Sequence, residues 1–207
     1  MTKIISFISR KGGTGKTTNA INLSACLHHM GNRVRLIETD TNYTLNTLRK
    51  MEVYKSDDDQ VDTFEITGSN DDTIAEEINH MKKEGHYDYV IVDSAGKTTD
   101  EGIKKLCLIS DAVLVPSSLT QNDLLVTYQT IQDLSPAKAI NQALKIIVLP
   151  NRIHSLTKHK TIEDAMNNLD ATILDCAVPQ KNLFVNFSTI EHEKEYIEVT
   201  KAILKQI

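Results

Sequence analysis

The sequence predicts an α/β fold, a doubly wound and mostly parallel sheet with helices on both faces. Short apolar runs of strand length alternate with segments of helical periodicity, which is typical of such sheets. No repeat, low-complexity tract or linker interrupts the 207 residues, which contain only 4 Pro and 8 Gly. A chain of this length buries roughly 70% of its unfolded surface, so we expect one domain over residues 1–207. Parallel sheets bind ligands at the carboxyl ends of their strands, where the candidate site residues below fall.

The first part of the chain predicts three strands and one helix. Lys3–Ser9 and Arg33–Glu38 are short apolar runs typical of strands. Between them, Thr17–Met30 carries apolar residues at helical spacing, and the pair Gly31–Asn32 favours a helix end. A third short strand is expected over Val61–Ile66.

The middle of the chain repeats this alternation. A helix is expected from about Asp71 to Glu84, followed by a stop at Gly85. Tyr87–Asp93 and Ala112–Pro116 are expected to be buried strands, and Asn122–Leu134 has the periodicity of a helix with one inward face. The acidic run at 57–59 is expected to be a solvated loop.

The last part of the chain predicts the strand Lys145–Pro150 and an amphipathic helix over about Thr189–Gln206. Anionic lipid would repel the acidic residues of this helix, so we expect it to pack on the core. They are Glu191, Glu193, Glu195 and Glu198. No apolar run approaches the ~18 residues of a membrane span.

The three cysteines do not predict a metal or redox site, because none is paired at a short spacing. Cys26, Cys107 and Cys176 are expected to be core thiols of a protein in a reducing cytosol.

A glycine-rich segment lies between the first expected strand and the first helix. The general phosphate-loop pattern is G-x-x-x-x-G-K-[ST]; here Arg10 replaces the first glycine and Gly15-Lys16-Thr17 is intact. Glycines let backbone N–H groups approach phosphates at a helix N-terminus. Lys16 can reach the β and γ phosphates, and the Thr17 hydroxyl can ligate Mg²⁺. The residues expected to hold the nucleotide here are Lys11, Gly12, Gly13, Thr14, Gly15, Lys16, Thr17 and Thr18.

Lys11 adds a second lysine at the start of this loop. The run Lys11-Gly12-Gly13-Thr14-Gly15-Lys16-Thr17 resembles the deviant Walker A motif of the ParA/MinD family of P-loop ATPases. The resemblance implies a doubly wound parallel sheet, ATP and Mg²⁺ as ligands, and a nucleotide sandwich dimer. It also implies that Lys11 reaches across the dimer to the phosphates of the second subunit.

Asp40 follows the second expected strand, where the family has an Asp-x-Asp segment. The resemblance implies that Asp40 orients the attacking water and touches the magnesium shell, and it makes Lys11, Lys16 and Asp40 the catalytic candidates. The sequence departs from the family because Glu38 replaces the first Asp and Thr41-Asn42 replaces Pro-Gln. A differently shaped loop is therefore expected after Asp40. The alternative for Asp40 is a turn or helix-cap residue.

Asp93 ends an apolar strand, which is the Walker B pattern of a carboxylate that holds Mg²⁺. The candidate metal ligands are therefore Thr17, Asp40 and Asp93. Gly96 follows closely and can act as a switch that senses the γ-phosphate, because a glycine amide approaches closely. A plain turn at Gly96 is the alternative.

The resemblance also places a base pocket after two later strands. Asn151 stands where related proteins place an Asn near adenine, and Pro179 with Gln180 matches a segment whose backbone lines that pocket. Ordinary loop chemistry is the alternative for all three residues.

The densest basic stretch runs from Arg152 to Lys160 in a chain of net charge −5. Arg152, Lys158 and Lys160, with Lys181 nearby in sequence, are candidates for gripping DNA phosphates without reading the base sequence. A solvated surface is the alternative.

Several functions are compatible with this motif. The chain is most similar to small ParA-type proteins that lack an N-terminal DNA-reading domain. That similarity implies a weak ATPase that dimerises with ATP, binds DNA on the nucleoid in the cytoplasm and partitions plasmids or other cargo. A centromere-binding or cargo-adaptor protein would stimulate hydrolysis. The second hypothesis is an ATP-dependent protein assembly or adaptor factor that does not bind DNA, and the third is a small-molecule kinase or ligase.

Overall fold

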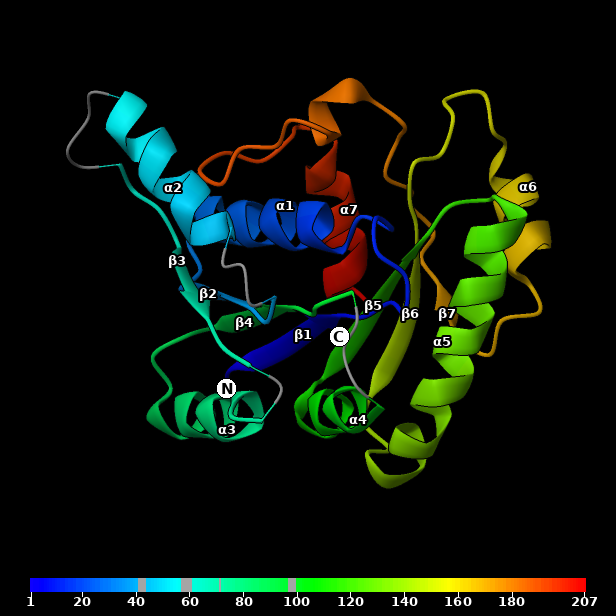
Figure 1. Ribbon diagram of the computed structural model, residues 1–207. Helices are drawn as coiled ribbons and strands as arrows, with labels where there is room; N and C mark the ends of the chain where they lie inside the picture. The colour runs from blue at the N-terminus through cyan, green and yellow to red at the C-terminus, as the bar shows by residue number, and fades with distance from the viewer. Residues whose placement is uncertain (41–43, 57–60, 71, 97–99) are drawn as a thin grey trace.

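The computed structural model describes residues 1–40, 44–56, 61–70, 72–96 and 100–207 (Figure 1). The described residues form a seven-stranded sheet in which every paired strand is parallel, so the expected fold class is confirmed. The strands, in the spatial order β3-β2-β4-β1-β5-β6-β7, are β1 (Lys3–Phe7), β2 (Val34–Glu38), β3 (Glu65–Gly68), β4 (Tyr89–Asp93), β5 (Ala112–Ser117), β6 (Lys145–Pro150) and β7 (Thr172–Ile173).

Helices cover both faces of the sheet (Figure 1). One face packs against α1 (Lys16–His29), α2 (Thr44–Lys55) and α7 (Tyr196–Leu204). The opposite face packs against α3 (Ile74–Glu84), α4 (Asp100–Ile109), α5 (Gln121–Ile140) and α6 (His159–Met166).

The central strand shows how the sheet separates two cores. In β1, Ile5 and Phe7 lie in the core beneath α1, whereas Ile4 lies in the core beneath α3, α4 and α5. Such alternation is the two-residue period of a strand, and burial on both faces explains its continuous apolar sequence. Because β1 lies between β4 and β5, the chain after β1 first builds one half of the sheet and later the other. The carboxyl end of β1 is therefore at the switch point where such sheets bind ligands.

Three helices were not expected from the sequence: α2, α4 and α6. In α2 the helical pattern is hidden, because one buried turn holds Leu45 and the next holds a charged residue, Arg49. Residues 41–43 and 57–60, which include the altered Thr41-Asn42 pair and the acidic run, lie outside the described residues.

The expected C-terminal helix over Thr189–Gln206 was too long. Only Tyr196–Leu204 is helical, because the preceding backbone bonds elsewhere: Asn22 Oδ1 of α1 accepts from Glu193 N at 2.9 Å and Glu52 Oε2 of α2 accepts from Thr189 N at 2.8 Å. The expectation that this helix packs on the core is confirmed. Among the described residues, no helix is both long and apolar enough to traverse a bilayer.

Other boundaries also differ from the expectation. The third strand is Glu65–Gly68 rather than Val61–Ile66, and the helix expected as Asn122–Leu134 extends over Gln121–Ile140. Of the cysteines expected in the core, two are buried and Cys176 is half-buried.

Arg49 fixes α2 against the rest of the molecule. Its guanidinium donates to Thr189 Oγ1 at 2.9 Å, to Thr189 O, and to Phe64 O at 2.8 Å, and it lies 4.5 Å from the centre of the Phe64 ring. Burial lowers the pKa of Arg49 to about 10. The buried guanidinium thus supplies hydrogen-bond donors to the backbone carbonyl groups of Phe64 and Thr189.

We predict that Arg49→Met lowers the free energy of unfolding by about 2 kcal/mol or more, because it leaves buried carbonyl oxygens without donors. Urea unfolding followed by circular dichroism measures the change. Arg33→Met is the matched control, because Arg33 pairs with Asp88 at the surface. Equal losses of stability in the two variants would contradict the structural role assigned to Arg49.

Candidate nucleotide-binding site

The phosphate loop, residues 9–18, joins β1 to α1 at the carboxyl edge of the sheet. Gly13 and Gly15 have left-handed backbones, with φ of 75° and 98°. A Cβ on Gly15 would also lie 2.4 Å from Asn151 Nδ2. Gly15 caps α1 without a side-chain hydrogen bond. The first N–H groups of such a helix suit an anion.

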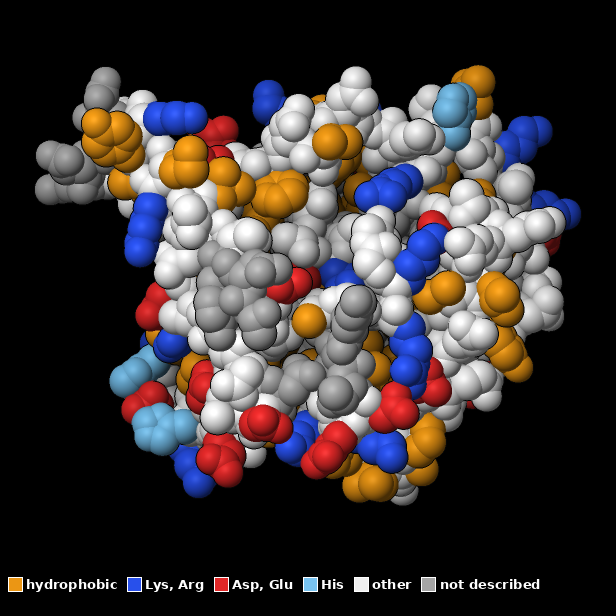
Figure 2. Space-filling model, in the orientation of Figure 1, with side chains coloured by type: hydrophobic (Ala, Val, Ile, Leu, Met, Phe, Trp, Pro, Cys, Tyr) orange, Lys and Arg blue, Asp and Glu red, His pale blue; other side chains and the backbone are white. Residues whose placement is uncertain are grey.

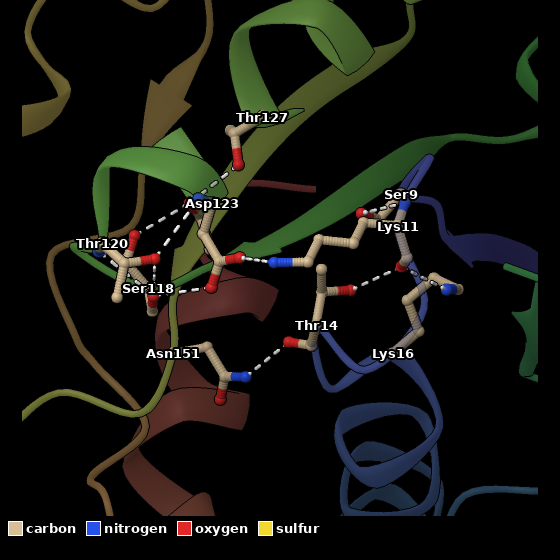
Figure 3. A network of polar contacts seen from close by, with 10 residues as sticks. Ser9, Lys11, Thr14, Lys16, Ser118, Thr120, Asp123, Thr127 and Asn151 are labelled. Atoms are coloured by element: carbon tan, nitrogen blue, oxygen red, sulfur yellow. Dashed lines mark hydrogen bonds and ion pairs between the residues drawn. The ribbon is translucent and has the colours of Figure 1, made fainter. Parts of the chain in front are cut away.

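Two asparagines brace this loop from neighbouring elements. Asn151, directly after β6, donates from Nδ2 to Thr14 O at 2.7 Å, and Figure 3 shows its amide aimed at that carbonyl. Asn19 in α1 donates from Nδ2 to Gly15 O at 2.7 Å. The expected position of Asn151 near the nucleotide is thus accompanied by a direct contact with the phosphate loop.

Two cavities lie on either side of the loop, and together they collect most of the residues expected at the site. The first, called here the phosphate cavity, is about 740 Å³, and the candidates that line it are Gly12, Gly13, Lys16, Thr17, Asp40, Asp93 and Gly96. The second, called here the base cavity, is about 400 Å³, and the candidates that line it are Gly15, Thr18, Asn151, Arg152, Pro179, Gln180 and Lys181.

Lys16 places a positive charge at the bottom of the phosphate cavity. The side chain belongs to the first residue of α1 and is only 6% exposed. Its ammonium donates a long hydrogen bond of 3.4 Å to Lys11 O. Burial lowers the pKa of Lys16, whereas the charges of Asp93 and Asp40 oppose this shift. A desolvated ammonium with one long hydrogen bond is well suited to bind a phosphate oxygen.

Asp93 faces the same cavity from the end of β4. Oδ1 of its carboxylate has no hydrogen-bond partner among the residues that the structure describes. Burial raises the pKa of Asp93 to about 7, whereas the neighbouring Thr17 side chain and the charge of Lys16 lower it. A buried carboxylate oxygen without a donor, next to a threonine hydroxyl, is the donor set that Mg²⁺ prefers. The residues therefore fit a magnesium ion.

Gly96 packs directly against the phosphate loop. A Cβ at this position would lie 3.3 Å from Gly12 Cα and 3.8 Å from Lys16 Nζ. Any group bound between Gly12 and Gly96 would therefore displace one of the two backbone segments. A glycine that senses a bound phosphate needs such close packing against the phosphate loop.

Lys11 lies beside the phosphate cavity and contacts its own chain. Its Nζ is 2.7 Å from Oδ1 of Asp123, an acidic residue in the first turn of α5 (Figure 3). Asp123 Oδ2 also accepts from Ser118 Oγ at 2.6 Å. These two contacts lower the pKa of Asp123 against the effect of its burial. The role of Lys11 across a dimer stays a prediction.

Arg10, which replaces the first glycine of the general motif, makes contacts that the sequence did not predict. Its guanidinium bonds to Asp100 at the start of α4, at 2.6 Å, and to Asp133 in α5. These acids are 90 and 123 residues away in the chain, so no local pattern could have identified them.

The four candidates for DNA binding occupy two places. Arg152 and Lys181 line the base cavity, and Lys181 pairs with Glu195. Lys158 and Lys160 are exposed at the N-terminal end of α6. Figure 2 shows Lys and Arg side chains at the upper right of the molecule and in a row down its right half.

A parallel sheet whose first strand leads through a glycine-rich loop into a helix, with a buried Lys at the start of that helix and a buried Asp at a strand end, defines a P-loop NTPase of the ParA/MinD type. The profile of the VirC1 protein family matches residues 2–201, so the chain belongs to the VirC1 family.

Two relatives share this family name. Protein virC1 of Rhizobium radiobacter is 28% identical over 154 residues, which are 73% of this chain and 64% of that protein. Protein virC1 of Rhizobium rhizogenes is 29% identical over 175 residues, which are 83% of this chain and 73% of that protein. The chain thus spans about two thirds of the length of these relatives. The sporulation initiation inhibitor protein Soj of Bacillus subtilis is 52% identical over 40 residues, 19% of this chain and 16% of Soj.

Solved structures share the fold. A chain of the MinC:MinD cell division protein complex of Aquifex aeolicus superposes with a TM-score of 0.73 at 19% identity, covering 99% of this chain and 96% of that one. A plasmid partition protein of Borrelia burgdorferi bound to AMPPNP gives 0.69 at 20% identity, covering 99% and 98%. Cobyrinic acid a,c-diamide synthase of Mycobacterium smegmatis with ADP and magnesium gives 0.73 at 20%, covering 99% and 95%.

We predict that Gly15→Ala displaces Asn151 and lowers both nucleotide affinity and the melting temperature. Gly31→Ala is the matched control: Gly31 also has a positive φ, of 84°, but nothing lies within 4 Å of its Cβ position. The control therefore carries only the left-handed backbone strain of about 1–2 kcal/mol. Calorimetry with MgATP and a melting curve measure both effects. If Gly15→Ala melted at the same temperature as Gly31→Ala and bound MgATP as tightly as the wild type, the result would contradict a brace between Asn151 and the loop.

Proposed function

We propose that this chain is an ATPase that binds MgATP at the phosphate loop, closes around it as a dimer and binds DNA without sequence preference to partition plasmids or other cargo. The observation that carries the proposal is the pair formed by Lys16 and Asp93. A buried ammonium and a buried carboxylate with an unpartnered oxygen face one cavity, and Mg²⁺ with a triphosphate satisfies both.

The nucleotide extends from one cavity to the other in this proposal. The triphosphate lies against Gly12 and Gly13, and adenine enters the base cavity beside Asn151. The wall of the base cavity is a backbone pairing in which Ile153 donates to Val178 O at 3.0 Å and Gln180 donates to Ile153 O at 2.9 Å. Through its bond to Thr14, Asn151 couples occupation of the base cavity to the position of the phosphate loop.

Hydrolysis in this proposal depends on the side chains of the phosphate cavity. Lys16 neutralises charge on the transferring phosphoryl group, Asp40 orients the attacking water, and Thr17 with Asp93 holds the magnesium ion. Bound Mg²⁺ supplies electrostatic stabilisation of the phosphate oxygens. Intrinsic turnover is slow in this proposal, and a centromere-binding or cargo-adaptor protein accelerates it.

Dimerisation requires Lys11 to leave Asp123. In the described chain this lysine is held by an ion pair that is partly shielded from water, since the Asp123 side chain is 13% exposed. ATP bound in a second subunit offers Lys11 stronger anions than one carboxylate. The dimer is then selected by differential binding, and ADP selects it less because it lacks the γ-phosphate.

We predict that Lys11→Ala abolishes the ATP-dependent dimer while MgATP affinity stays within about threefold, because Lys16 holds the nucleotide of its own subunit. Light scattering after size exclusion, with MgATP or MgADP, measures the mass. Lys138→Ala, which removes an exposed lysine of α5, serves as the control. A Lys11→Ala chain that dimerises with ATP as the wild type does would remove the crossing role.

DNA binding in this proposal depends on the basic end of α6. Lys158 and Lys160 are exposed there, and Arg152 lies at the base cavity, where nucleotide binding can reposition it. A single copy offers few such charges in a chain of net charge −5, whereas a dimer doubles the number of phosphates that can be bound. Affinity for DNA therefore follows the ATP dimer, which localises the protein to the nucleoid of the cytoplasm.

We predict that the double variant Lys158→Ala/Lys160→Ala weakens ATP-dependent DNA binding equally on all sequences. The salt slope is expected to fall by roughly 1 for each DNA phosphate that the variant no longer neutralises. Lys50→Ala/Lys55→Ala is the control, because it removes the same charge from α2. Co-sedimentation with DNA across a salt series measures both. Wild-type protein that binds no DNA at low salt with any nucleotide would remove DNA from the function.

An adaptor function without DNA is the second candidate, and the outer face of α5 favours it. Leu125 and Tyr128 are 57% and 47% exposed on this helix, and Asp123 and Asp133 are engaged by the phosphate loop. Neutral, partly apolar surfaces suit protein contacts better than phosphate contacts. Nucleotide-dependent dimerisation without DNA binding in the salt series supports this second function.

A further inference from the structure

Glu38 is a buried acid that the proposed chemistry does not use. It ends β2 and is 3% exposed. Both of its carboxylate oxygens are occupied by the start of α2. Oε1 accepts from Thr44 N at 3.1 Å and from Thr44 Oγ1 at 3.0 Å, and Oε2 accepts from Leu45 N at 3.1 Å. Glu38 therefore caps a helix that begins six residues later in the chain, where a negative charge is favoured by the helix dipole.

Asp40 lies between two fixed points of the backbone. On one side, Thr39 N donates to Asp93 O at 3.1 Å, and Thr39 Oγ1 accepts from Ala95 N at 3.0 Å. On the other side, Thr44 is held by Glu38. Since three residues separate Asp40 from Thr44 in the sequence, anchoring the first turn of α2 limits where Asp40, which lines the phosphate cavity, can lie.

The length of the side chain at position 38 decides whether this anchor exists. An aspartate is shorter by one carbon–carbon bond, about 1.5 Å. Hydrogen bonds of 3.0–3.1 Å to Thr44 and Leu45 would then stretch well beyond the limit for such bonds unless α2 moved by a similar amount. The location of α2 therefore depends on having a glutamate, rather than an aspartate, at position 38.

We propose that Glu38 is a positioning residue for hydrolysis, which acts by anchoring α2 and thereby placing Asp40 against the attacking water. This inference rests on the proposed ATPase function. Displacing an orienting group by about 1 Å slows a reaction by up to 100-fold. Nucleotide affinity depends mainly on Lys16 and the phosphate loop. Glu38 lines the same phosphate cavity, but both of its carboxylate oxygens are engaged by the start of α2 rather than by the loop. The expected signature is a loss of turnover without a matching loss of binding.

Single-turnover hydrolysis of ATP with enzyme in excess tests this role, with MgADP affinity measured by calorimetry on the same preparations. Glu38→Gln and Glu38→Asp are expected to slow hydrolysis on the order of tenfold or more, with MgADP affinity changed less than about threefold. Thr44→Val removes one donor and is expected to slow hydrolysis about threefold.

Glu52→Gln is the matched control. It makes the same chemical change at another acid that ties down α2: Glu52, within this helix, accepts from Thr189 N at 2.8 Å. Because it lies at the far end of α2 from Thr44, it is expected to lower the melting temperature while hydrolysis stays within about twofold of the wild type.

Two results would overturn the inference. One is hydrolysis at the wild-type rate in the Glu38 variants, or in Thr44→Val if the Glu38 variants do not fold. The other is a loss of MgADP affinity equal to the loss of rate, which indicates a general structural role. A wild-type chain that binds no MgATP or does not hydrolyse it contradicts the proposed function itself, and with it the role of Glu38.

Discussion

A lysine ammonium that is nearly sealed from water is the constraint on which the site depends. Lys16 loses hydration because it begins α1 under the phosphate loop, and its carboxylate neighbours Asp93 and Asp40 only partly offset that loss. Burial in turn raises the pKa of Asp93, so neither charge is fully compensated within the described chain. The sheet holds both groups at one edge, where a polyanion with its counter-cation supplies the missing partners.

The same loop is tied to distant parts of the fold by few contacts. Arg10 joins it to α4 and α5, Lys11 joins it to α5, and Thr14 joins it to β6 through Asn151. Gly96 packs against Gly12 on the opposite side. Because a packed interior transmits small shifts, the nucleotide can change the relation of several elements at once. A single surface ion pair is weak, so the position of the phosphate loop depends on the several pairs that it makes together more than on any one of them.

The part of the architecture that local sequence determines could be predicted. Consecutive residues determine both the apolar strands buried on both faces and the loop Gly15-Lys16-Thr17. The strands lie in the sheet and the loop lies at the start of α1, as the sequence predicts. Contacts between distant residues could not be predicted: nothing near Lys11 in the sequence indicates Asp123. The helix α2 was missed because Arg49 interrupts its apolar face. The C-terminal helix was overextended because spacing alone does not show that the backbone before Tyr196 bonds to α1 and α2.

Thermal unfolding with and without magnesium tests the central claim most directly. A ligand that satisfies Lys16 and Asp93 binds only the folded state and raises the melting temperature with its concentration. We expect a clear rise with MgATP and a smaller rise with ATP in EDTA. Asp93→Asn is expected to remove the difference between the two, because the magnesium ion then loses its buried ligand. A melting temperature that does not change with millimolar MgATP would contradict the account.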